Sequence, residues 1–244
     1  EFKAENEWKV SRFIWENQRE GIFATAQILE RQQKLLPLMP NLKILYVPKG
    51  PLLKDWNNDH FFREVISDLV AYARKRKAIF IKIDPDILIE GEDLIEFPVD
   101  ALDCGKQIIQ KLQHNGWFYS NEQIQFKNTV WINLRADENA LIDRMKSKTR
   151  YNLKISQKKG VKIHRAQIAD LPLLYDLYAQ TSTRDGFIIR PEKYYISLWE
   201  RMFKSKKAIG LIAFVERKPV AGLILFIFAQ KAWYFYGMSS DYHR

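Results

Sequence analysis

The sequence predicts an α+β protein with two related domains, and the order of its segments carries this prediction. Segments with strand-like alternation come first, segments with helical spacing of apolar residues follow, and strands then return. The same order appears a second time in the 244-residue chain, without a residue-level repeat. Runs of strands and runs of helices are typical of α+β domains. We therefore expect a boundary near Leu134, with residues 1–134 and 135–244 as the two domains.

The first half begins with strands and continues with a helix. Alternation predicts an antiparallel meander of three strands in residues 8–16, 21–32 and 42–48. Between Asn58 and Lys77, apolar residues recur at the spacing of one buried helical stripe. This stripe comprises Phe61, Phe62, Val65, Ile66, Leu69, Val70 and Ala73. The segment AIFIKIDP then predicts a central strand that ends at Asp84.

The rest of the first half predicts one more helix and two more strands. The helix extends from Val99 to Gln113 and ends before Asn115-Gly116, a pair typical of helix C-termini. Alternation in residues 117–126 and 128–134 predicts the strands.

The second half repeats this plan. Asp137 can cap a helix that continues through a basic stretch to Gly160. After it we expect a strand at 161–166, helices at about 170–180 and 191–203, and strands at 209–216, 219–228 and 232–238.

The basic stretch from Arg144 to Arg165 has the strongest local charge. It contains nine cations and no carboxylate, in a chain with a net charge of +10. A solvated lysine-rich helix face is the simpler interpretation of such a run. Like charges left without counterions over twenty-two residues favour an anionic partner instead, which can be nucleic acid, a nucleotide or an acidic membrane surface.

Several classes of site are excluded by their missing patterns. No two of the ten glycines are separated by one residue, so dinucleotide-binding and P-loop motifs are absent, as is the Gly-rich pyrophosphate loop of acyl-CoA enzymes. The four histidines lack metal-ligand spacing and Cys104 is the only cysteine, so we expect no metal and no cofactor. No apolar run reaches about 20 residues and no signal peptide is visible, which favours a cytoplasmic protein.

Residues 181–195 form the second informative segment. A plain helix-loop-helix explains it, with Asp185-Gly186 as the turn and Pro191 at the start of the next helix. The segment also concentrates hydroxyl and guanidinium donors suited to diphosphate or carboxylate recognition. These donors are Thr181, Thr183, Arg184, Arg190, Tyr194 and Tyr195.

Five segments together resemble the FemABX family of peptidoglycan bridge enzymes. They are LKILYVPKGPLL, AIFIKIDPD, MKSKTRYNLKISQKKGV, TSTRDGF with Tyr194-Tyr195, and YFYGMSSDYHR, and they occur in the family's order. The resemblance implies two tandem N-acetyltransferase-like (GNAT-like) domains with mixed, mostly antiparallel sheets and packed helices. It also implies transfer of an amino acid from aminoacyl-tRNA to the stem-peptide amine of a peptidoglycan precursor, which is nucleotide-linked (UDP-linked) or lipid-linked.

The resemblance also assigns roles to individual residues. It implies that Asp84 lies near the incoming amine as the catalytic acidic residue. The precursor-binding residues implied are Lys3, Arg190, Tyr194 and an aromatic pocket at Tyr234 or Tyr236. Beside the family's arginine-tyrosine-asparagine signature, the basic helix becomes the expected tRNA surface, with Arg150, Lys154, Lys158 and Lys159.

One family block is missing from the chain. A phenylalanine-lysine block that supplies a lysine at the reacting centre is expected beyond Arg244, so the second domain is expected to be incomplete at its C-terminus. Peripheral contact with the inner membrane face is also compatible with the implied substrate. Two other functions stay open: an N-acyltransferase that uses acyl-CoA on another amine, and a non-catalytic RNA-binding module.

Overall fold

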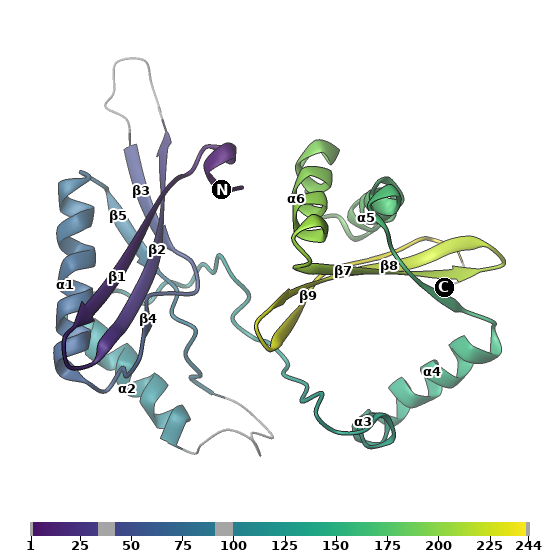
Figure 1. Cartoon of the computed structure of the whole chain (residues 1–244), viewed down its shortest axis with the longest axis horizontal. Helices are drawn as coiled ribbons and strands as arrows, with labels where there is room; N and C mark the ends of the chain where they lie inside the picture. The colour runs from purple at the N-terminus through teal and green to yellow at the C-terminus, as the bar shows by residue number, and fades with distance from the viewer. Residues whose placement is uncertain (1, 34–41, 91–99, 243–244) are drawn as a thin grey trace. The chain divides into compact units, whose positions relative to one another are not determined.

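The chain folds into two compact units, Glu1–Val130 and Trp131–Arg244. The structure, a computed structural model, describes residues 2–33, 42–90 and 100–242, and each unit has its own sheet and helices (Figure 1). The assignment of residues 1–134 and 135–244 to two related domains stays a prediction.

The first unit is built on a mixed sheet. Its elements are η1 (Ala4–Asn6), β1 (Lys9–Asn17), β2 (Gly21–Gln33), β3 (Leu42–Val47), β4 (Leu52–Leu53), α1 (Asp59–Lys75), β5 (Phe80–Ile83) and α2 (Asp100–His114). Strands β1, β2 and β3 pair antiparallel, which confirms the predicted meander. Strand β5 pairs parallel to β3 and ends the order β1-β2-β3-β5, so its predicted central position is wrong for the described residues.

Helix α1 supplies one side of the first core. The Asn58 side chain accepts hydrogen bonds from the backbone N–H groups of His60 and Phe61, which caps the first turn. Six of the seven predicted stripe residues are buried, and Val70 is half-buried. Their side chains share a core with Leu45 and Val47 of β3. Burial of each large apolar side chain contributes about 2 kcal/mol, so this stripe holds α1 on the sheet.

Helix α2 packs near the start of α1. The Lys111 ammonium lies 2.5 Å from an Asp59 carboxylate oxygen and 4.3 Å from the centre of the Phe62 ring. The helix ends before Gly116, whose φ of 80° is left-handed, as predicted. Its predicted start at Val99 lies outside the described residues.

A partly buried ion pair joins the other end of α1 to the sheet. Arg76, the C-cap of α1, donates from Nε and Nη2 to the two Glu30 carboxylate oxygens at 2.6 and 2.7 Å. Glu30 lies on β2 and is only 3% exposed. The hydrogen bonds from Arg76 hold the pKa of Glu30 below its usual value. The pair therefore fixes the end of α1 on β2.

The strands predicted at residues 117–126 and 128–134 are wrong. These residues are in a described part of the chain and form no strand. Phe118, Phe126 and Val130 are 95%, 94% and 85% exposed. Alternation gives stable strands only where a neighbouring strand supplies the ladder and the alternating side chains pack, and no described strand pairs with this segment.

The second unit is built on an antiparallel sheet in the order β6-β7-β8-β9. Its elements are α3 (Glu138–Arg144), α4 (Ser147–Lys158), β6 (Lys162–Arg165), η2 (Ile168–Asp170), α5 (Leu171–Asp185), α6 (Glu192–Lys204), β7 (Ala208–Val215), β8 (Lys218–Phe228) and β9 (Lys231–Ser239). Helices α5 and α6 lie on the same face of this sheet (Figure 1). Leu174, Trp199 and Ile224 are fully buried in the unit.

Residues 137–160 form two helices, α3 and α4, so the single helix predicted from Asp137 to Gly160 is wrong. Met145 and Lys146 take extended backbone, with ψ of 145° at both residues, and this separates α3 from α4. The Arg150 guanidinium donates to the carbonyls of Asp143 (2.9 Å) and Met145. It thereby satisfies carbonyls that the last turn of α3 leaves without intrahelical partners. The predicted capping by Asp137 is confirmed, because its side chain accepts from the Ala140 N–H.

We expect Glu30→Gln to lower the free energy of unfolding by about 2 kcal/mol at pH 7, because a charged hydrogen bond to Arg76 is lost. A carboxylate with a lowered folded pKa stabilises above its unfolded value, about 4.3, and this contribution disappears as pH falls through the folded pKa. Urea unfolding at pH 7 and at about pH 3 should show the difference from wild type shrinking at low pH. Glu7→Gln, which removes the exposed partner of Arg31, is the control and should have little effect. Equal losses in both variants would contradict the role of the pair.

Candidate functional site

The parallel pairing of β3 with β5 positions Asp84 beside the segment that follows β3. The Asp84 N–H donates to the Gly50 carbonyl at 3.0 Å, and the Tyr46 hydroxyl donates to the Asp84 carboxylate at 3.1 Å. Tyr46 pairs with Lys82, two residues before Asp84, so the three side chains share one face of the sheet. Sequence segments 42–53 and 78–86 therefore meet at one strand end.

Tyr46 was not identified from the sequence, although it lies in one of the five quoted segments. It is 6% exposed, and burial raises its pKa to about 12. Its hydroxyl therefore stays protonated at neutral pH and orients the carboxylate of Asp84. A half-buried carboxylate held in this way can accept a hydrogen bond or a proton from an incoming amine. Lys3, by contrast, lies in the exposed turn before β1.

A cluster of aromatic side chains, which we call the aromatic cluster, joins three elements of the second unit. Its members are Tyr178 of α5, Tyr194, Tyr195 and Trp199 of α6, and Tyr236 of β9. The Tyr236 ring lies 5.6 Å from Tyr178, 5.8 Å from Tyr195 and 5.4 Å from Trp199, measured between ring centres. Trp199 has no exposed surface. The tyrosine hydroxyls therefore sit on an apolar base.

Arg190 adds a cation to the aromatic cluster. Its guanidinium carbon lies 4.7 Å from the centre of the Tyr194 ring, and its backbone N–H donates to the Tyr195 hydroxyl at 3.3 Å. Burial raises the pKa of Tyr178 to about 12 and raises those of Tyr194 and Tyr236 above their usual values. The cluster thus combines neutral hydroxyl donors with one guanidinium, a combination suited to phosphate or carboxylate groups.

The structure separates the two residues proposed for the aromatic pocket. Tyr236 pairs with Ile224 and Tyr234 pairs with Leu225, with a bulge between them. Because Ile224 and Leu225 are consecutive, their partners point to opposite faces of the sheet. Tyr236 joins the aromatic cluster, whereas Tyr234 is 69% exposed and extends over Gly237, where a Cβ would lie 1.7 Å from the Tyr234 hydroxyl. Bulges often re-aim side chains beside functional sites.

Two side chains of residues 181–195, Thr181 and Arg184, hold β9 in place. The Ser239 N–H donates to Thr181 Oγ1 at 2.9 Å. Arg184 donates from Nη1 to the Ser239 carbonyl at 2.9 Å and from Nη2 to Ser239 Oγ at 3.0 Å, and it also pairs with Asp241. The helix-loop-helix interpretation thus accounts for Thr181 and Arg184. Of the donors that the sequence groups together, Arg190, Tyr194 and Tyr195 lie at the aromatic cluster.

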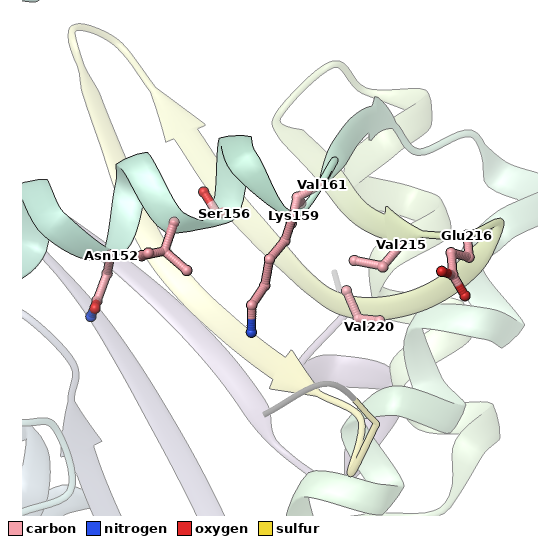
Figure 2. A pocket seen from close by; sticks show the side chains of 8 residues that line it. Asn152, Ser156, Lys159, Val161, Val215, Glu216 and Val220 are labelled. Atoms are coloured by element: carbon pink, nitrogen blue, oxygen red, sulfur yellow. The ribbon is translucent and has the colours of Figure 1, made fainter.

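The basic stretch borders a cleft of about 450 Å³ between α4 and the turn that joins β7 to β8. The residues that line the cleft are Asn152, Ile155, Ser156, Lys159, Val161, Val215, Glu216 and Val220. Figure 2 shows Asn152 and Lys159 extending from the same side of α4. Lys154 and Lys158 are exposed, whereas Arg150 caps α3. Of the four residues predicted to bind tRNA, two are exposed on α4, one lines the cleft and one binds the carbonyls of α3.

The described residues contain no candidate metal site and no candidate membrane span. No group of three or more His, Cys, Asp or Glu side chains there could hold a metal ion. None of the helices described has both the length and the apolar character that a membrane span requires.

We expect Thr181→Val to lower the free energy of unfolding by about 2 kcal/mol, because the half-buried Ser239 N–H loses the hydroxyl of buried Thr181 as its acceptor. Thr183→Val is the matched control, since Thr183 is exposed and its hydroxyl donates to the Ala179 carbonyl within α5. Its effect should stay within about 0.5 kcal/mol. Urea unfolding of both variants measures the difference, and similar values would show that Thr181 does not anchor β9.

Comparison with known proteins places the chain in a family. The model of the FemAB family matches residues 1–218. The Lipid II:glycine glycyltransferase of Staphylococcus epidermidis (strain RP62A) is 25% identical over 219 residues, which cover 84% of this chain and 48% of that protein. The Staphylococcus aureus (strain MRSA252) protein of the same name is 24% identical over 193 residues, covering 78% and 43%. The chain spans about half the length of these curated relatives.

A solved structure has the same fold. The crystal structure of FemX matches with a TM-score of 0.78 and 17% identity, over 100% of this chain and 74% of that chain. This match confirms the predicted fold class, an α+β protein with mixed sheets and packed helices. The family match, which covers most of the sequence, shows that the chain belongs to the FemAB family.

Proposed function

We propose that this chain is part of an aminoacyltransferase that moves an amino acid from aminoacyl-tRNA to the stem-peptide amine of a peptidoglycan precursor. Family membership supports this, together with relatives whose names describe glycine transfer to lipid II. We place the reaction in the cytoplasm, where aminoacyl-tRNA is available.

The aromatic cluster with Arg190 is the observation that carries the proposal. A peptidoglycan precursor has diphosphate and carboxylate groups beside sugar rings. Arg190 can pair with an anionic oxygen, the Tyr194 and Tyr236 hydroxyls can donate hydrogen bonds, and the rings can pack on sugars. Lys3 is proposed as a further precursor contact, from the family resemblance alone. Tyr236 is the better of the two aromatic candidates, because Tyr234 points to the other face of the sheet.

The proposed chemistry needs no nucleophile from the protein. The precursor amine attacks the ester carbonyl, a C–N bond forms, the C–O bond to the tRNA ribose breaks, and the ribose hydroxyl leaves with a proton. Asp84 is proposed to accept the proton that the amine loses, and Tyr46 is a positioning residue for its carboxylate. The remaining acceleration comes from holding the amine and the ester carbonyl close together in the reactive orientation.

The tRNA is proposed to bind along the basic stretch. Lys154 and Lys158 are exposed on α4, and Lys159 lines the cleft beside it. The basic stretch itself contains no carboxylate. Its ammonium groups suit the phosphate backbone of RNA, whose binding releases counterions and weakens with salt. Arg150 is proposed to act mainly by fixing the angle between α3 and α4, because its guanidinium already binds backbone carbonyls.

We expect Lys154→Glu with Lys158→Glu to lower tRNA-dependent transfer by about 100-fold and to leave precursor binding nearly intact. The assay is transfer of a radiolabelled amino acid from aminoacyl-tRNA by the full-length protein. Arg74→Glu with Lys75→Glu makes the same charge change on α1 and should leave transfer near the wild-type rate. Unchanged transfer in the α4 variant would remove the tRNA assignment.

We expect Asp84→Asn to lower kcat by a factor of about 10² to 10⁴ with little change in KM for the precursor, because the amine loses its proton acceptor. Asp86→Asn is the control, since Asp86 is exposed and pairs with Lys49 at 3.2 Å. The same transfer assay, with both substrates varied, separates kcat from KM. If the two variants behaved alike, Asp84 would have no role in proton transfer.

The same assays separate the alternative functions. Thiol release from acyl-CoA in place of transfer from tRNA would indicate an N-acyltransferase for another amine. Salt-dependent RNA binding by the full-length protein without any transfer would indicate an RNA-binding module.

A further inference from the structure

One end of the second sheet gathers lysines and exposed aromatic rings. The Ile227 N–H donates to the Lys207 carbonyl at 2.9 Å, which holds the α6–β7 connection beside the β8–β9 turn. Figure 1 shows both connections at the same end of the sheet. We call this region the lysine-aromatic end, and it consists of Lys204, Lys206, Lys207, Phe228, Lys231 and Trp233.

The lysine-aromatic end is exposed throughout. Residues 204–207 and 228–235 are all exposed. Phe228 is 65% exposed, Trp233 is 44% exposed and Phe235 is 54% exposed. A turn that displays several large rings to water is unusual for a surface without a partner. The rings therefore indicate a contact with an apolar phase or with another molecule.

The charge of this end is one-sided. From Arg201 to Ser240 the sequence contains seven cations and one carboxylate, Glu216. Glu216 lies in the β7–β8 turn, at the other end of β7 and β8 from Lys207 and Lys231. Glu200, on the last turns of α6, pairs with Lys204 at 2.5 Å. Lys206, Lys207 and Lys231 thus give the lysine-aromatic end a net positive charge.

The placement of the lysines favours a lipid surface over RNA. The Lys207 ammonium lies 5.8 Å from the centre of the Phe228 ring, and the Lys231 ammonium lies 4.3 Å from that of Trp131. These lysines occupy ring faces on which RNA bases would stack. A protruding turn whose rings enter the interface while lysine ammonium groups reach lipid phosphates is typical of peripheral membrane binding.

We propose that the lysine-aromatic end docks on the surface of an anionic lipid bilayer. Phe228 and Trp233 enter the boundary between head groups and acyl chains, and Lys206, Lys207 and Lys231 bind lipid phosphates. Each basic residue at an anionic surface contributes about 1 kcal/mol, so three lysines with two rings give reversible binding. Vesicle binding by this region does not require a second membrane-binding site elsewhere in the protein.

Ring contacts connect the lysine-aromatic end to the aromatic cluster. Phe235 stacks on Phe226 at 4.8 Å and lies 5.1 Å from Tyr236, measured between ring centres. Along α6, the ten helical rises from Tyr194 to Lys204 span about 15 Å. A lipid-linked acceptor could therefore keep its lipid in the bilayer while its polar part reaches Arg190 and Tyr194. This last step rests on the proposed function, whereas bilayer docking itself does not.

The test is sedimentation of the full-length protein with vesicles of phosphatidylcholine containing about one third phosphatidylglycerol. We expect wild type to bind, and Lys206→Glu with Lys207→Glu to lower the partition coefficient by about 30-fold or more. Phe228→Ser should lower it by about 10-fold. Arg217→Glu with Lys218→Glu, at the opposite turn of the same sheet, is the matched control and should bind as wild type does.

Several outcomes would overturn the proposal. They are absence of vesicle binding by wild type, an equal loss in the Arg217/Lys218 control, or a loss of RNA binding in the Lys206/Lys207 variant with vesicle binding unchanged. Unfolding curves that match wild type show that each variant is folded. Transfer to a soluble nucleotide-linked precursor should be unchanged in the Lys206/Lys207 variant. If wild type binds vesicles but transfers no amino acid, the proposed function fails and the docking surface stands.

Discussion

The second unit depends on the burial of one side chain, the indole of Trp199. This ring has no exposed surface and contacts Tyr178 of α5, Tyr195 of its own helix and Tyr236 of β9. Each large ring buries on the order of 150–250 Å². These contacts therefore hold α5, α6 and β9 together in one packed unit. The hydroxyls above it are positioned by packing rather than by a flexible loop, which is what precise recognition of a polar ligand requires.

In the first unit, hydrogen bonds position the candidate catalytic side chain. Strand β5 ends where Asp84 meets Gly50 and Tyr46, and the parallel register of β3 and β5 determines which residues come together. Apolar residues Leu45 and Val47 hold β3 against α1 from the opposite face. A shift of one residue in this register would put the Tyr46 and Asp84 side chains on opposite faces of the sheet. The candidate catalytic carboxylate thus depends on the same packing that stabilises the unit.

Local patterns predicted the helices well and some strands poorly. The stripe of α1 and the glycines at 116, 160 and 186 were informative because helix periodicity and left-handed C-termini are local properties. Residues 117–134 alternate as strands do, but a strand also needs a neighbour, which sequence alternation does not specify. The break at Met145 follows from Arg150, five residues ahead, binding the carbonyls at the end of α3. That contact competes with continued helix and leaves no periodic signal.

Sequence patterns predicted only part of the candidate site. Arg190, Tyr194 and Tyr236 were found because they lie in segments with a family resemblance, and the structure brings them to one cluster. Trp199 and Tyr178 were missed because an aromatic residue on a helix predicts only burial. Arg184 was grouped with the ligand donors because its bonds to Ser239 join residues 55 positions apart. Long-range hydrogen bonds of this kind decide whether a donor is free for a ligand, and sequence spacing does not contain them.

The two basic regions of the second unit are far enough apart to serve different anions. The cleft beside α4 includes Val215 and Glu216 at one end of β7, and the lysine-aromatic end begins at Lys207 at the other. The eight residues of β7 span roughly 26 Å at about 3.3 Å per residue. This length is about three Debye lengths at physiological ionic strength, where the Debye length is about 8 Å. Phosphates bound at α4 would therefore screen the lysines near β9 only weakly, so RNA and an anionic bilayer need not compete for the same charge.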